Sequence, residues 1–185
     1  MQQVYILTTY TGTVLSCIIK RVTKVEYAHV SIGLDSDLNE VYSFGRKHVS
    51  NPVFAGFVRE YIDDGLYKKM ANTKCKVYVL EVTDEQYNKI RKKIDYFIDN
   101  KKKFKYDVLA LLKLLGGHPR ENRFRFVCSQ FVAYVLEEGG IKLFSKPSNM
   151  ITPKDFLTLT DVKVEYEGLL SEYRKRNKNE KRILN

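Results

Sequence analysis

The chain has little cysteine, and its cysteines form neither a disulfide framework nor a metal site. Cys17, Cys75 and Cys128 are an odd number and lack CxxC spacing, which is typical of a reducing compartment rather than of a disulfide-stapled secreted domain. The three histidines are equally scattered and no HExxH is present, so no zinc site is predicted. Glycine-rich loops that open a helix after a strand, as phosphate and dinucleotide binding require, are also missing. We therefore expect neither a metal nor a cofactor.

Long apolar runs are missing as well. The first ten residues carry no basic leader and too short an apolar run for a signal peptide, and no later segment reaches a membrane-spanning length. A cytoplasmic location is the expectation. Repeats, low-complexity tracts and an interdomain linker are absent too, and 185 residues with 44% hydrophobic composition suit one domain with a substantial core.

Positive charge, by contrast, is abundant. The net charge of +10 comes from 32 Lys and Arg against 22 Asp and Glu, and much of it lies in residues 89–105 and 174–182. Such runs attract anions, but most simply they are the solvated face of a helix and a frayed terminus, not a nucleic-acid surface. We predict one domain over residues 1–168 and a basic tail over 169–185. The charge constrains macromolecular partners only loosely: peripheral contact with an anionic membrane stays open, and nucleic acid is not expected.

The hydrophobic pattern predicts an α+β domain. Strict alternation over residues 27–34 indicates a half-buried strand, and turn chemistry at 35–39 makes 41–44 its returning partner. Further strands are predicted at 76–82 and 162–166. Helices are predicted near 12–22, after a capping box at Thr83, over 107–115, from Cys128 and after Thr152. In the Thr83 helix, the side chains expected to face inward are Tyr87, Ile90, Ile94, Phe97 and Ile98.

Cys128 opens an apolar helical stripe. Phe131, Val132, Val135 and Leu136 follow it at helical spacing, and two glycines at 139–140 end the helix. The thiol should therefore lie in the first turn, where unpaired amide N–H groups and the helix dipole stabilise a thiolate. This placement predicts a lowered cysteine pKa and a nucleophile.

A cysteine nucleophile needs a histidine and a polar group that orients the imidazole. Of the three histidines, only His29 projects from the interior of a predicted strand, on its less apolar face. If Tyr42 and Phe44 share the apolar face of the hairpin, Ser43 must share the face of His29. Ser43 is therefore the candidate third residue. The alternatives are Glu40 and Ser31.

These residues resemble a known family, the circularly permuted NlpC-type, papain-like cysteine hydrolases. The resemblance is greatest to the YiiX-like group, which is distantly related to lecithin:retinol acyltransferase. It covers most of the chain and is carried by the early loop at 9–13 and by the segments at 26–33, 41–44, 127–131 and 152–156.

The resemblance implies a permuted papain-like fold, in which an antiparallel sheet bearing His29 packs against the helix that begins at Cys128. Cys128 would be the nucleophile, His29 the base, and Tyr10 part of a loop bordering the cleft. Ser129 and Gln130, next to the nucleophile, would contact substrate. Ser43 stands where many relatives carry glutamate or histidine, and many relatives carry an export leader that is not visible here.

The resulting hypothesis is a cysteine hydrolase of the amidase or peptidase kind, working through an acyl-enzyme. Its substrate would be a small molecule, a peptide or an acyl lipid. One alternative is a lipid esterase or acyltransferase that uses the same two residues. The other is a catalytically inactive module that holds nucleic acid through its basic segments.

Overall fold

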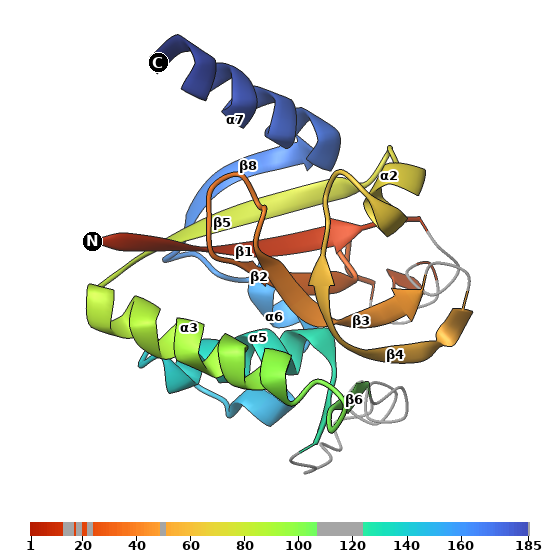
Figure 1. Ribbon diagram of the computed structural model, residues 1–185, viewed down its shortest axis with the longest axis vertical. Coiled ribbons are helices and arrows are strands. Elements are labelled where there is room, and N and C mark those ends of the chain that lie inside the picture. Colours follow the sequence, from red (N-terminus) through yellow and green to blue (C-terminus); the bar gives the residue numbers. More distant parts are fainter. Residues whose placement is uncertain (13–16, 18–19, 22–23, 49–50, 107–123, 185) are drawn as a thin grey trace.

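The computed structural model describes residues 1–12, 17, 20–21, 24–48, 51–106 and 124–184. Its centre is a six-stranded sheet with strand order β4-β3-β2-β1-β5-β8, in which every neighbouring pair is antiparallel. The strands are β1 (Gln2–Tyr10), β2 (His29–Gly33), β3 (Val41–His48), β4 (Asn51–Glu60), β5 (Lys74–Val82) and β8 (Lys163–Leu169). The α+β class is therefore confirmed (Figure 1).

The predicted hairpin of β2 and β3 has the expected register. Ile32 lies opposite Tyr42 and Gly33 opposite Val41, so residues on the two strands that share a face match the alternation in the sequence. Val30 and Phe44 join Ile32 and Tyr42 in one buried cluster. The polar residues of both strands consequently lie on the opposite face of the sheet.

One face of the sheet is covered by three helices, α3 (Asp84–Asp99), α5 (Cys128–Glu138) and α6 (Pro153–Leu157). Helix α3 begins at the predicted capping box, in which Thr83 and Gln86 satisfy each other's backbone N–H. Its inward residues pack as expected, except that Ile98 is exposed although Phe97 beside it is buried, because successive helix residues point about 100° apart. A parallel pair of two-residue strands, β6 (Lys105–Tyr106) and β7 (Arg125–Phe126), precedes α5.

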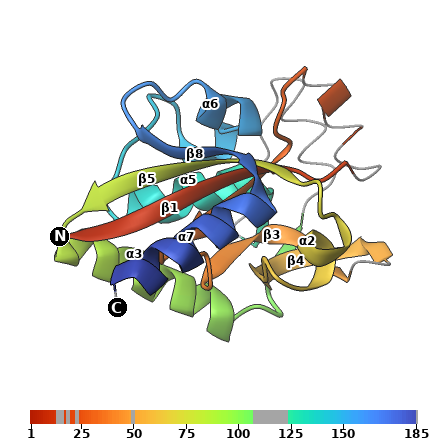
Figure 2. The ribbon, with the colours of Figure 1, turned by 90° about the horizontal axis from the view of Figure 1, so that it is seen from above.

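The other face carries α2 (Gly65–Lys69) and α7 (Leu170–Leu184). In Figure 2, α7 crosses the sheet on the side opposite to α5. Leu170 and Tyr173 are buried there in a second cluster with Tyr67 of α2. In place of a free basic tail, residues 170–177 are thus docked on the sheet, because the helix turns apolar side chains toward it.

A further difference from the sequence expectations concerns the first strand, while two of the expected helices are not tested. The central strand β1 was not predicted, since its run of buried residues shows no alternation. The expected helix over 107–115 lies outside the described residues, as does most of the helix expected near 12–22. Among the described residues, no helix is long and apolar enough to cross a membrane.

Candidate active site

Cys128 is the first residue of α5, as predicted, and its side chain is almost fully buried. The helix ends after Glu138, and Gly140 adopts a positive φ of 80° there, a conformation that glycine takes without a steric penalty. The start of α5 is held by Gln130, whose Oε1 accepts a hydrogen bond from the Val127 N–H at 3.2 Å. The sequence therefore places the sulfur at the positive end of a well-defined helix.

The sulfur reaches the sheet where β2 and β3 separate. Among the described residues, the ladder between these strands contains only the pairs at Ile32 and Gly33, and the N–H of Val30, before these pairs, interacts with the Cys128 sulfur. The backbone N–H groups of Val30 and Ser129 both lower the pKa of Cys128. Two elements far apart in sequence thus meet around one atom.

His29 is the partner that the structure brings to this sulfur. It is the first residue of β2 and pairs with Thr9 of β1. Its Nε2 lies 2.7 Å from Oε1 of Glu60, at the end of β4, which leaves Nδ1 as the ring nitrogen available to the thiol. The contact with the imidazole that was expected of Ser43 is therefore made by Glu60.

Glu60 is held by four donors. Oε1 is contacted by His29 and accepts a hydrogen bond from Ser43 Oγ at 2.5 Å, while Oε2 accepts from Ser31 Oγ at 2.7 Å and from Tyr67 OH at 3.0 Å. A buried carboxylate is costly unless its lone pairs are satisfied. Here both oxygens have two partners, so the charge can remain on Glu60.

The three ionisable groups reinforce one another's charged forms. Burial alone would raise the pKa of Glu60, but the charge of His29 and the surrounding hydrogen bonds lower it to about 2. Burial opposes the imidazolium too, but the Glu60 carboxylate and the Cys128 thiolate hold the pKa of His29 well above its usual range. At Cys128, burial would raise the pKa of the thiol, but the charge of His29 and its hydrogen bond outweigh burial and lower that pKa. This arrangement favours the charged form of each group: a thiolate at Cys128, an imidazolium at His29 and a carboxylate at Glu60.

The side chains of Ser129 and Gln130 are buried and hydrogen-bonded to backbone carbonyls. Ser129 is buried and donates to the Ile151 carbonyl at 2.7 Å, and the Gln130 amide donates to the Asn149 carbonyl at 2.6 Å. Both side chains tie the start of α5 to the segment before α6. Both side-chain donors thus have partners within the protein, and the contacts with substrate expected of these residues stay a prediction.

Tyr10 lies at the end of β1, one residue beyond Thr9, which is opposite His29. Its hydroxyl is 3.4 Å from Cys17 Sγ, and Lys20 Nζ lies 4.3 Å from the centre of its ring. The contacts described for Tyr10 are therefore with the segment that follows it. A role beside the cleft stays a prediction.

The remaining candidates are placed elsewhere. Glu40, an alternative third residue, forms an ion pair with Arg91 of α3. Ser31, the other alternative, contacts Glu60 and not the imidazole.

Burial next to Glu167 raises the pKa of Cys75 to about 12, which makes this cysteine a poor nucleophile. His118 and the side chain of His48 lie outside what the structure describes. Among the described residues, no group of three or more potential ligands could hold a metal ion.

Sequence reasoning missed Glu60 because it considered only the first hairpin. Glu60 pairs with Val41, and β3 and β4 turn back on each other at the pair His48 and Asn51. The turn-forming sequence Ser50-Asn51-Pro52 was the available signal. A second hairpin predicted from it would have placed a carboxylate on the face of Ser43.

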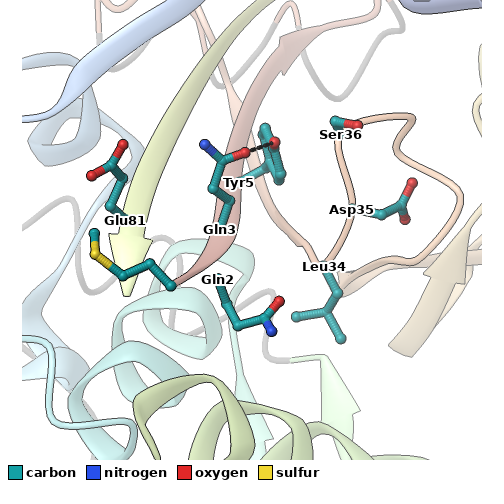
Figure 3. A pocket seen from close by; sticks show the side chains of 8 residues that line it. Gln2, Gln3, Tyr5, Leu34, Asp35, Ser36 and Glu81 are labelled. Atoms are coloured by element: carbon teal, nitrogen blue, oxygen red, sulfur yellow. Dashed lines mark hydrogen bonds between the residues drawn. The ribbon is translucent and has the colours of Figure 1, made fainter. Parts of the chain in front are cut away.

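A surface hollow of about 430 Å³ lies at the other end of β1 (Figure 3). Gln3, Tyr5, Asp35 and Glu81 are among its lining residues. Since Thr9 is the β1 residue opposite His29, this hollow is displaced from the sulfur along the strand. It does not belong to the Cys128 site.

Comparisons with protein-family models, with curated proteins and with solved structures found no match.

Proposed function

We propose that this protein is a cysteine hydrolase of the amidase or peptidase kind, with Cys128 as nucleophile, His29 as acid and base, and Glu60 as the orienting residue. The observation that carries the proposal is the chain of contacts from the thiol at a helix N-terminus, through an imidazole, to a buried carboxylate. We further propose that the fold is a permuted papain-like one, in which the histidine strand precedes the cysteine helix. The order His29, Glu60, Cys128 along the chain supports this assignment.

The proposed reaction begins with attack of the Cys128 thiolate on the carbonyl carbon of an amide or ester. The bond from carbon to the leaving nitrogen or oxygen breaks as the His29 imidazolium gives that atom its proton, and an acyl-cysteine thioester remains. The Cys128 backbone N–H lies in the first turn of α5, where N–H groups have no partner within the helix, and is suited to stabilise the oxyanion.

Water completes the proposed cycle. Neutral His29 takes a proton from water, the resulting hydroxide attacks the thioester, and the C–S bond breaks to release the acid and restore the ion pair. Glu60 keeps the imidazole in the tautomer with its proton-bearing Nε2 toward the carboxylate.

An electrophilic acyl probe tests the proposal. Wild-type protein should be labelled at Cys128, and Cys128→Ala should lose that label, since His29 stabilises the Cys128 thiolate. Cys75→Ala is the matched control, because Cys75 is also buried but its pKa is raised to about 12, and it should label like the wild type. Equal labelling of wild type and Cys128→Ala would count against the nucleophile.

A substrate comparison then separates the two enzyme classes. Under the proposal, peptide or small amide substrates are turned over and phospholipid vesicles are not. Turnover of vesicles alone would favour the esterase or acyltransferase alternative. Absence of both labelling and turnover would favour a binding module.

A further inference from the structure

We infer that Tyr67, supported by Ser31 and Ser43, is a positioning residue for the proposed hydrolase site: its hydroxyl fixes the Glu60 carboxylate in the orientation that holds His29. The inference rests on the proposed function, because it assigns a role in the ionisation of Cys128. Tyr67 comes from α2, an element that contributes nothing directly to the Cys128–His29 pair.

The geometry separates the two oxygens of Glu60 by task. Oε1 contacts His29 and accepts from Ser43, whereas Oε2 accepts only from Ser31 and Tyr67 among the described contacts. Without the donors on Oε2, rotation of the carboxylate would cost less, and Oε1 would no longer be directed at the imidazole. Fixing one oxygen therefore orients the other.

Tyr67 is suited to this task because it is itself immobilised. Its ring is buried in the cluster that includes Leu38, Ile62 and Tyr173, and its hydroxyl lies 3.4 Å from Thr9 Oγ1 as well as 3.0 Å from Glu60. Burial and the Glu60 charge raise the pKa of Tyr67 well above its usual value, so the hydroxyl keeps its proton and remains a donor.

The position of Tyr67 in the chain strengthens the argument. Thr9 is the β1 partner of His29, so the tyrosine hydroxyl lies between the strand next to His29 and the carboxylate at the end of β4. The Tyr67 side chain thus connects α2 to β1, the neighbour of the His29 strand, and to β4, which carries Glu60. A purely packing residue would need only the ring.

The variant Tyr67→Phe isolates the hydroxyl, because the ring and its packing remain. The measurement is iodoacetamide alkylation of Cys128 across pH, followed by mass spectrometry, which needs no known substrate. Losing the donor raises the Glu60 pKa and loosens its hold on the imidazolium, so the thiolate is less favoured at acidic pH. The rate of Cys128 alkylation should increase with pH around a midpoint in the acidic range. In Tyr67→Phe we expect this midpoint to rise by roughly 0.5 pH unit or more. In Ser43→Ala it should also rise, and in Tyr67→Phe/Ser43→Ala it should rise furthest.

Tyr173→Phe is the matched control. Tyr173 is buried in the same cluster and also loses one hydrogen bond on substitution, to the Ser36 carbonyl at 2.9 Å, but it does not contact Glu60. It should lower the melting temperature without moving the alkylation midpoint. If Tyr67→Phe and Tyr173→Phe have the same midpoint as the wild type, or the same shift from it, the positioning role is overturned.

The wild-type profile separates this inference from the proposed function. A wild-type midpoint at the value of a free thiol, about 8.5, contradicts both. A low wild-type midpoint that neither Tyr67→Phe nor Ser43→Ala alters contradicts only the positioning role. A low wild-type midpoint that shifts in Tyr67→Phe and Ser43→Ala, but not in Tyr173→Phe, supports both.

Discussion

Glu60 shows how a charge is kept inside a protein at the scale of single residues. Its side chain is only 11% exposed, yet every one of its contacts favours the ionised form. Removing any one donor leaves a buried lone pair unsatisfied, which costs more than the hydrogen bond itself contributes. The serines at 31 and 43, which look like ordinary strand residues, are for this reason part of the electrostatics of the site.

Ser129 illustrates the opposite case, a polar residue next to the nucleophile whose side chain serves the fold. Ser129→Ala should lower the free energy of unfolding by about 1–3 kcal/mol, because the buried Ile151 carbonyl loses its 2.7 Å partner. The alkylation profile of Cys128 should stay unchanged, since only the backbone N–H of Ser129 faces the sulfur. Denaturant melts and iodoacetamide kinetics measure the two effects.

Ser171→Ala, at an exposed position of α7, is the control for the serine substitution and should change neither quantity. A change in substrate affinity in Ser129→Ala without loss of stability would restore the cleft role first expected for this residue.

At the scale of elements, the C-terminal helix α7 supports the part of the chain that carries Glu60. Arg174 donates to Asp63 at 2.7 Å and to Asn39 at 3.1 Å, and Asp63 follows Glu60 by three residues. Tyr173 and Asn177 both donate to the Ser36 carbonyl. The helix therefore fixes the turn that holds Ser36 and Asn39 and the turn that holds Asp63, on the face of the sheet where the Glu60 carboxylate lies.

This docking predicts the effect of Arg174→Ala. Arg174 is largely buried while Asp63 is more than half exposed, so the pair should be stronger than a surface ion pair but partly screened. We expect a loss of about 1–2 kcal/mol in the free energy of unfolding. A double-mutant cycle with Asp63→Ala measures the interaction.

Lys175→Ala removes the same charge from an exposed neighbour in α7 and should have little effect. A coupling energy near zero in the cycle would mean that apolar contacts alone hold the helix.

At the scale of the whole molecule, the site should make stability depend on pH. The pKa of Glu60 is lowered from 4.5 to about 2, so the folded state holds fewer protons than the unfolded state between these values. The contribution of ionised Glu60 to the free energy of unfolding is present above pH 4.5 and is lost as the pH falls toward 2. The shift in pKa corresponds to a contribution on the order of 3 kcal/mol.

Comparison with Glu60→Gln isolates that contribution. The variant should be less stable than the wild type at neutral pH, and the difference should narrow as the pH falls from 4.5 toward 2. Urea melts at a series of pH values measure this difference in the free energy of unfolding, with Glu137→Gln as the control at an exposed carboxylate. A difference that stays constant with pH would show that Glu60 is not ionised in the folded protein.

Local patterns in the sequence determined the elements and the faces of the site. The stripe after Cys128, the capping box at Thr83 and the alternation around His29 each depend on neighbours within a turn or a strand, so α5, α3 and the β2–β3 hairpin follow from sequence spacing alone. Only the tertiary structure decided which groups meet. Glu60 reaches His29 from 31 residues away along the chain, and α7 docks through contacts more than 100 residues distant. Such pairings depend on how the β3–β4 hairpin and the helices pack across the sheet, which no local periodicity encodes.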